Sequence, residues 1–166
     1  MTFAPRTWVV GEVVSAATMN QEIRDQFNSM FAAWTSYTPV WTASGTAPVL
    51  GNGTLSGRYM KIGRTVVAHI QLVMGSTTTY GTGDYSFSLP ANTANAGASL
   101  VTAAQLLAGS DRWAGECVLG SNASTTSPFF SSTATNTRLA WMGPTTPATL
   151  ASGHQLRMTL MYEAAS

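Results

Sequence analysis

The side chains that could do acid–base or metal chemistry are few in this sequence and lie far apart. Its two histidines, His69 and His154, lack the short spacing that places two imidazoles on one metal ion. Cys117 has no second thiol with which to form an internal disulfide or a metal site. The acidic candidates are equally scattered: Glu12, Asp84, Asp111, Glu116 and Glu163. The sequence therefore predicts a protein that is not an enzyme and that holds no metal and no cofactor. A Ser/His/Asp site assembled from distant loops stays open as the alternative.

Aromatic rings beside hydroxyl groups are a second kind of candidate, because a ring can stack on a sugar while its neighbours bind the sugar's hydroxyls. Trp113 and Trp141 fall on apolar positions of their predicted strands, so we expect them in the core. Trp41 and Tyr80 are freer, and Tyr80 lies in a loop rich in Thr and Gly just before Asp84. If there is a carbohydrate contact, the sequence favours Tyr80 and Asp84; otherwise this loop is a plain surface loop or a subunit contact.

The composition is that of a folded protein with a largely uncharged surface. Of the 166 residues, 45% are hydrophobic and only 9% are charged, and 8 Lys and Arg nearly balance 7 Asp and Glu. This hydrophobic content excludes intrinsic disorder, and so few cations argue against a nucleic-acid-binding protein, which must neutralise several phosphates. The chain has neither the apolar run of a membrane span nor that of a secretory signal. We therefore expect a protein made in a cytoplasm.

One segment near the N-terminus has the apolar spacing of an α-helix. Ser15 is a suitable N-cap, and apolar side chains follow at intervals of three and four residues. On a helix they share one face, away from Glu22 and Asp25. We call this set the helix stripe: Met19, Ile23, Phe27, Met30 and Trp34. The helix stripe is predicted to pack against copies of the chain or against another protein, with packing on the chain's own β-domain as the alternative.

From residue 37 onward the apolar period falls to two, which indicates β-strands with one buried face. The predicted strands cover residues 37–42, 59–62, 65–74, 85–89, 112–119, 128–132, 137–142 and 155–162. Gly63 and Arg64 fit the central positions of a two-residue type II′ hairpin turn. Residues 94–109 fit either a helix or an apolar strand. The sequence thus predicts a mainly β protein: an antiparallel β-sandwich or jelly roll at residues 36–166, preceded by an arm and one amphipathic helix at residues 1–35.

Several stretches of the sequence resemble a known group of proteins. They read PRTWVVGEVVSAATMN at 5–20, IRD at 23–25, YTPVWT at 37–42, GNGTLSGRY at 51–59 and IGRTV at 62–66, with a weaker match, GHQLR, at 153–157. These stretches are similar to the N-terminal arm, the helix and the start of the β-domain in minor structural proteins of tailed bacteriophages, especially phages of actinobacteria. The similarity covers about the first ninety residues, and residues 92–147 resemble nothing that we can name.

The resemblance implies a non-enzymatic protein of the virion, trimeric, that serves as a minor tail protein, a tail-tip component or a fibre component. Its N-terminal segment would attach to other tail or capsid proteins, and its β-domain would face outward, where it could contact the host surface. One alternative is a capsid decoration protein or head fibre. Another is a receptor-recognition module that binds a host cell-wall glycan. Neither nucleic acid nor a membrane span is expected among its partners.

Overall fold

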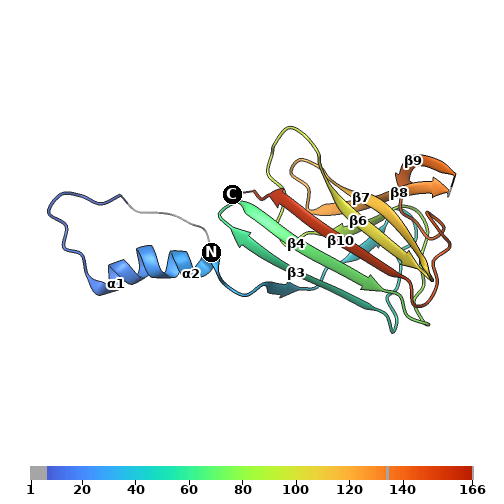
Figure 1. Ribbon diagram of the computed structural model, residues 1–166, viewed down its shortest axis with the longest axis horizontal. Coiled ribbons are helices and arrows are strands. Elements are labelled where there is room, and N and C mark those ends of the chain that lie inside the picture. Colours follow the sequence, from blue (N-terminus) through green and yellow to red (C-terminus); the bar gives the residue numbers. More distant parts are fainter. Residues whose placement is uncertain (1–6, 134, 166) are drawn as a thin grey trace.

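The computed structural model describes residues 7–133 and 135–165 and shows a mainly β protein with one helical arm (Figure 1). Pro5 and Arg6 of the phage-like motif lie outside the described residues. A curled antiparallel sheet forms the body of the molecule, and the helical arm stands away from one end of it. In the described ranges no helix is long and apolar enough to cross a membrane.

The helical arm consists of three consecutive helical segments: α1 (Ala16–Met19), a π-helical turn η1 (Asn20–Arg24) and α2 (Asp25–Met30). Ser15 caps the helix as predicted, since its Oγ accepts a hydrogen bond from the backbone N–H of Thr18 at 3.1 Å. The helix ends at Met30, because Phe31 leaves helical geometry with φ −110° and ψ 9°. Trp34 therefore lies beyond the helix, and its place in the predicted helix stripe is wrong.

In the described part of the chain ten strands follow the arm, and every pair of neighbours in the sheet is antiparallel. They are β1 (Thr35–Tyr37), β2 (Trp41–Ala43), β3 (Thr54–Ile62), β4 (Thr65–Val73), β5 (Tyr85–Ser88), β6 (Leu100–Ala108), β7 (Asp111–Leu119), β8 (Thr125–Thr133), β9 (Asn136–Trp141) and β10 (Gln155–Glu163). The order across the sheet is β1-β3-β4-β10-β6-β7-β8-β5-β2, and β9 pairs with β8 outside this path.

Two regions differ from the strand predictions in an informative way. The predicted strand at residues 37–42 is in fact two short strands, β1 and β2, which stand at opposite ends of the sheet path. Pro39 lies between them, where a residue without a backbone N–H could not continue a strand ladder. The ambiguous region at residues 94–109 contains a strand, β6, and no helix.

The curl of the sheet comes from β8, which has three different neighbours along its length. Thr125 and Thr126 pair with β5, the middle of the strand pairs with β7, and its last residues pair with β9. By contrast, β4 and β10 are paired along their full lengths in the middle of the sheet. The sheet therefore turns at β8 and brings β5 and β2 over the inner face of the other strands.

The core lies inside this curl and is built by the period-two pattern. Alternate side chains of β4 and β10 are buried, as predicted, and pack with inward side chains of β6, β7, β8, β5 and β2. The largest fully buried side chains are Tyr85, Phe87, Phe130, Ile70, Leu72, Met74, Leu106, Leu119, Met142, Leu156, Met158 and Leu160. All residues of this buried cluster come from the segment between Trp41 and Ala164, so the helical arm contributes nothing to it.

Three tryptophans test the prediction of which aromatic rings are buried. Trp113 is half-buried against the core, as expected. Trp141, predicted in the core, is 49% exposed, because β9 lies outside the main path and pairs only with the end of β8. Trp41, predicted to be freer, is buried, with its ring stacked on that of Phe87 at a centroid distance of 6.2 Å.

The turn between β3 and β4 has the predicted form. Ile62 pairs with Thr65, so the loop consists of Gly63 and Arg64 alone. Gly63 has a φ of +58° and Arg64 has a negative φ, as a type II′ turn requires. Arg64 also holds the end of β10: its guanidinium lies 3.1 Å from a carboxylate oxygen of Glu163, and its Nε donates to the backbone carbonyl of Ala164 at 3.1 Å.

Candidate functional site

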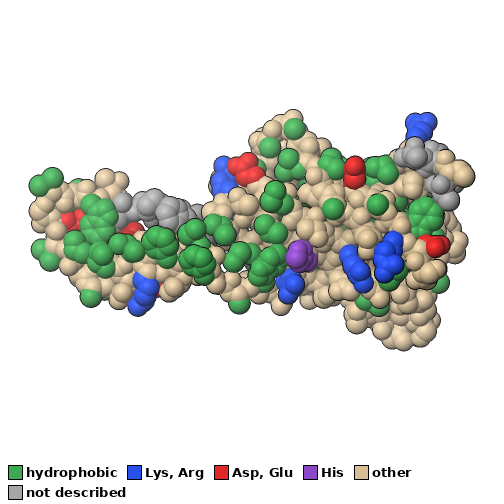
Figure 2. Space-filling model, in the orientation of Figure 1, with side chains coloured by type: hydrophobic (Ala, Val, Ile, Leu, Met, Phe, Trp, Pro, Cys, Tyr) green, Lys and Arg blue, Asp and Glu red, His purple; other side chains and the backbone are tan. Residues whose placement is uncertain are grey.

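The apolar side chains of the helical arm lie on the surface of the molecule. Met19, Ile23, Phe27 and Met30 are 41, 43, 58 and 40% exposed, and Phe31, just beyond the helix, is 81% exposed. Figure 2 shows hydrophobic side chains along the length of this arm. They form one uncovered apolar surface that the chain's own β-domain does not bury.

The segment before the helix extends this uncovered surface. A turn joins Val9 to Glu12, whose backbone N–H donates to the Val9 carbonyl at 3.2 Å. The large hydrophobic side chains around this turn are all exposed: Trp8, Val9, Val10, Val13 and Val14. Among the described residues, most of the exposed large hydrophobic side chains therefore belong to the arm.

Trp34 is the point where the arm meets the sheet. Its ring lies 4.7 Å from the ring of His69 on β4, and the guanidinium of Arg58 on β3 lies 5.5 Å from the Trp34 ring centroid. These contacts place Trp34 against the outer face of the sheet, at the base of the arm and apart from the other residues of the helix stripe.

The hydroxyl groups of the Tyr80 loop are used inside the protein. Thr78 Oγ1 donates to the Leu50 carbonyl at 2.6 Å and accepts from the Gly75 N–H at 2.8 Å. Thr77 Oγ1 donates to Asn52 Oδ1 at 3.0 Å and accepts from the Asn52 N–H at 2.9 Å. These bonds tie the loop to residues 50–53, so the hydroxyl hydrogens of Thr77 and Thr78 are already used inside the protein.

Tyr80 and Asp84 share this loop but have different surroundings. The Tyr80 side chain is partly buried against the core, and burial raises its pKa. Its carbonyl accepts a hydrogen bond from the Tyr85 hydroxyl at 2.7 Å. Asp84 is exposed, and its backbone exchanges two 2.9 Å hydrogen bonds with Ser44. Part of the Tyr80 ring is thus used in packing against the core, which leaves less of it open as a platform for a sugar.

The titratable residues do not gather in one place. His154 belongs to the turn before β10, where its Nδ1 accepts a hydrogen bond from the Ala151 N–H at 3.3 Å. His69 lies on the outer face of β4. Cys117 is buried, and burial raises its pKa to about 12, so its thiol is not a nucleophile at neutral pH. Within residues 7–133 and 135–165 no three His, Cys, Asp or Glu side chains form a group that could hold a metal ion.

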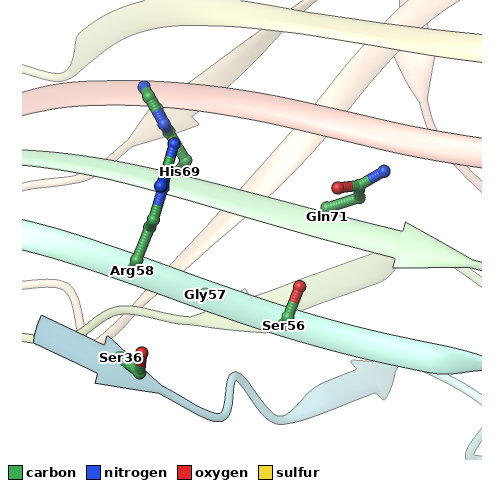
Figure 3. Close-up of a pocket in the computed structure, with 6 residues that line it drawn as sticks. All are labelled: Ser36, Ser56, Gly57, Arg58, His69 and Gln71. Atoms are coloured by element: carbon green, nitrogen blue, oxygen red, sulfur yellow. The ribbon is translucent and has the colours of Figure 1, made fainter. Parts of the chain in front are cut away.

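A shallow groove, absent from the sequence predictions, lies on the outer face of the sheet, and Figure 3 shows the residues that line its first part. It consists of two shallow depressions of about 290 and 210 Å³ that share His69 and Gln71 of β4. The first is also lined by Ser36 of β1 and by Ser56, Gly57 and Arg58 of β3. The second continues over β10, where it is lined by Arg157, Met158 and Thr159. We call these two depressions together the outer groove.

The register of the strands explains how the outer groove is assembled. Arg58 lies opposite His69, which lies opposite Thr159, and one step along the same face Ser56, Gln71 and Arg157 lie side by side. Figure 3 shows Arg58 extending from β3 toward His69, with Ser56 and Gln71 farther along the same two strands. Each of these residues occupies a polar position of a strand in which polar and apolar residues alternate. Only the pairing of β4 with β10, which is far from it in the sequence, brings Arg157 next to the others.

Comparison with models of protein families, with curated proteins and with solved structures gave no match to the chain. Its function is therefore inferred from the helical arm, the curled sheet and the outer groove.

Proposed function

We propose that the chain is a non-enzymatic structural protein of a tailed-phage virion, of the minor-tail kind, which attaches to the particle through its N-terminal arm. One observation carries this proposal: the arm stands away from the β-domain and exposes a continuous apolar surface. The phage-like sequence motifs fall on this same arm and on the strands that follow it. The β-domain then faces outward from the particle.

The exposed arm requires a partner for energetic reasons. Burying one Ile or Phe side chain contributes on the order of 2 kcal/mol. Covering Ile23, Phe27 and their neighbours would therefore stabilise an assembly strongly, whereas leaving them in water gains nothing. We infer that copies of the chain bury these stripes against one another as a trimer and that residues 7–14 contact other tail or capsid proteins.

For the β-domain, we infer a two-layered β-sandwich of the jelly-roll type. Its buried side chains come from both parts of the curled sheet: β4, β10, β6 and β7 on one side, and β2 and β5 on the other. Such domains are packed solid, and their loops and outer faces are what remains for contact with other molecules.

The location of the protein in the virion distinguishes this proposal from a capsid decoration protein or a head fibre. Purified particles of the phage that encodes the chain would be examined by electron microscopy with an antibody against the β-domain. We expect label on the tail, lying outside its surface. Label on the capsid would favour a decoration protein or head fibre, and absence of the chain from purified particles would contradict a virion protein altogether.

A further inference from the structure

We propose that copies of the chain also contact one another through a row of apolar side chains on the outer face of the sheet, close to the arm. We call this row the apolar band: Met60 of β3, Val67 of β4, Met161 of β10, Val101 of β6 and Val118 of β7. The inference rests on the proposed self-association of the arm and adds to it a second contact surface, which belongs to the β-domain.

The register of the strands assembles the apolar band. Val67 lies opposite Met60 on one side and opposite Met161 on the other. Val101 lies opposite Val118, and Met161 and Val101 stand two residues beyond the last pair that joins β10 to β6. The residues that alternate with these five are directed toward the core. The apolar band therefore crosses five neighbouring strands on the face turned away from the core.

The rows on either side of the apolar band contain charged residues. One row includes Arg58, His69 and Glu116, and the other includes Glu163, whose carboxylate is paired with Arg64. The water-facing side of an antiparallel sheet usually carries polar residues. Five apolar residues in one row therefore need an explanation other than the strand pattern.

Two members of the apolar band are largely open to water. Met161 is 65% exposed and Val101 is 57% exposed, whereas Met60, Val67 and Val118 are half-buried. Single exposed apolar side chains are common on soluble proteins, but neighbouring ones that form a continuous patch mark a contact with another molecule. The apolar band is a patch of this second kind.

A second copy of the chain is the partner that fits this position. Trp34, at the base of the arm, lies against His69, one row away from the apolar band, and α2 contacts β3. Figure 2 shows hydrophobic side chains along the arm and on the adjoining end of the sheet, on the same side of the molecule. In a cyclic assembly every copy turns the same surface to its neighbours. Copies that pack their helix stripes together therefore bring their apolar bands together as well.

The cations of the outer groove limit how far this contact extends. Arg58 and Arg157 lie on the same face, farther from the β3–β4 turn than the apolar band. Close approach of several copies there would bring like charges together. The β-domains of an assembly should therefore touch at the apolar band and separate beyond it, which leaves the outer groove open. The band is small, so it acts together with the helix stripe and not in its place.

Cross-linking of the full chain tests whether the bands meet. Met161→Cys places a thiol on the apolar band, and Val49→Cys places one at a site that is 59% exposed, in the loop before β3. A short bifunctional maleimide should join copies of Met161→Cys into covalent dimers on a denaturing gel. It should leave Val49→Cys and the wild type as single chains, because the native Cys117 is buried.

A matched pair of charged substitutions measures what the contact contributes. Val101→Asp should raise the concentration at which half of the assembly dissociates by roughly tenfold or more, because the new carboxylate would be buried in an apolar contact. Val49→Asp makes the same change at an equally exposed valine outside the band and should shift that concentration less than about twofold. Analytical ultracentrifugation of the full chain over a range of concentrations measures both.

Either of two results would overturn the contact through the band and leave self-association through the arm standing. One is a yield of covalent dimers from Met161→Cys that does not exceed the yield from Val49→Cys. The other is a weakening of the assembly by Val101→Asp that does not exceed the effect of Val49→Asp, which would indicate net charge as the cause. A wild-type chain that is monomeric at micromolar concentration would contradict the arm and the band together.

Discussion

Two glycines near the start of the sheet are required for different physical reasons. A Cβ on Gly57 would collide with the ring of Tyr37, which packs there beneath β3. A Cβ on Gly63 would meet no atom within 4 Å, but the φ of +58° at this residue is unfavourable for other side chains. At Gly57 the lack of space excludes a larger residue, and at Gly63 the positive φ disfavours one.

Substitutions at Gly63 test the effect of backbone conformation alone, because an added Cβ there would meet no other atom. Gly63→Val should lower the free energy of unfolding by roughly 1–3 kcal/mol, because a β-branched residue is strained at positive φ. Gly63→Asn should cost clearly less, because Asn tolerates this region of φ and ψ. Urea denaturation measures both. Equal stability of Gly63→Val and the wild type would mean that the turn has another conformation.

Burial makes the protein sensitive to alkaline pH. Burial raises the pKa of Cys117 to about 12 and of Tyr162 to about 12, and it also raises those of Tyr37 and Tyr85. The unfolded chain releases these protons at lower pH than the folded chain does. Stability is therefore full below about pH 8, where both states are protonated, and falls as pH rises toward 12.

The size of this effect can be checked in two ways. Each unit of raised pKa corresponds to roughly 1.4 kcal/mol, so urea titrations between about pH 8 and pH 11 should show a loss of several kcal/mol. At about pH 8, the native Cys117 thiol should resist iodoacetamide, whereas the urea-unfolded chain should react readily. A native thiol that is alkylated as fast as the unfolded one would show that Cys117 is not held in the core.

Single residues were predictable where their role is local. Ser15 and Gly63 act on groups within three residues of themselves, so the sequence could identify both. Trp41 was misplaced because its surroundings come from a strand far away in the chain. Trp34 was misplaced because the helix ends at Met30, and Trp141 because β9 lies outside the main path of the sheet. An alternating pattern tells which side of a strand a ring is on, but not whether that strand lies in the middle of the sheet or at its margin.

At the scale of elements, the helical arm is the feature with the clearest test. Ile23→Asp together with Phe27→Asp should dissociate the assembly, because each charge would have to be buried in an apolar seam. Light scattering of the full chain at micromolar concentration measures the result. A wild-type chain that is itself monomeric there would contradict self-association through the arm.

The other side of the same helix provides a matched control. Gln21 and Asn28 lie about half a turn of the helix wheel away from the centre of the apolar face. Gln21→Asp together with Asn28→Asp adds the same two charges to the helix and should leave the oligomeric state unchanged. Dissociation by both double variants would attribute the effect to net charge rather than to the apolar face.

Elements were easier to predict than their pairing. The alternation in β4 and β10 identified both strands, and the turn at Gly63 and Arg64 identified the pairing of β3 with β4. Nothing local indicates that β10 inserts between β4 and β6, since these strands lie far apart in the sequence. The outer groove depends on that insertion. Its residues could therefore be identified beforehand only as polar positions of their strands, not as members of one groove.

At the scale of the whole molecule, the arm and the β-domain should be separable. Every residue of the buried core lies between Trp41 and Ala164, and α2 makes few contacts with β3. A chain of residues 35–166 should therefore unfold in one transition, with a free energy of unfolding within roughly 2 kcal/mol of the full chain. It should also be monomeric. Failure of this shortened chain to fold would show that the arm stabilises the sheet.

The position of β1 and β2 has a consequence for solubility. These strands end the sheet path on its two sides, yet residues 38–40 alone connect them, a reach of roughly 14 Å at most. The two ends of the sheet path are therefore held close together, and each end is a strand of three residues. Long open margins are the usual template for aggregation, and charged side chains are the usual protection against it. A chain with 9% charged residues has little of that protection, so the shortness of β1 and β2 matters: it leaves few backbone groups of these two end strands open to edge-to-edge pairing.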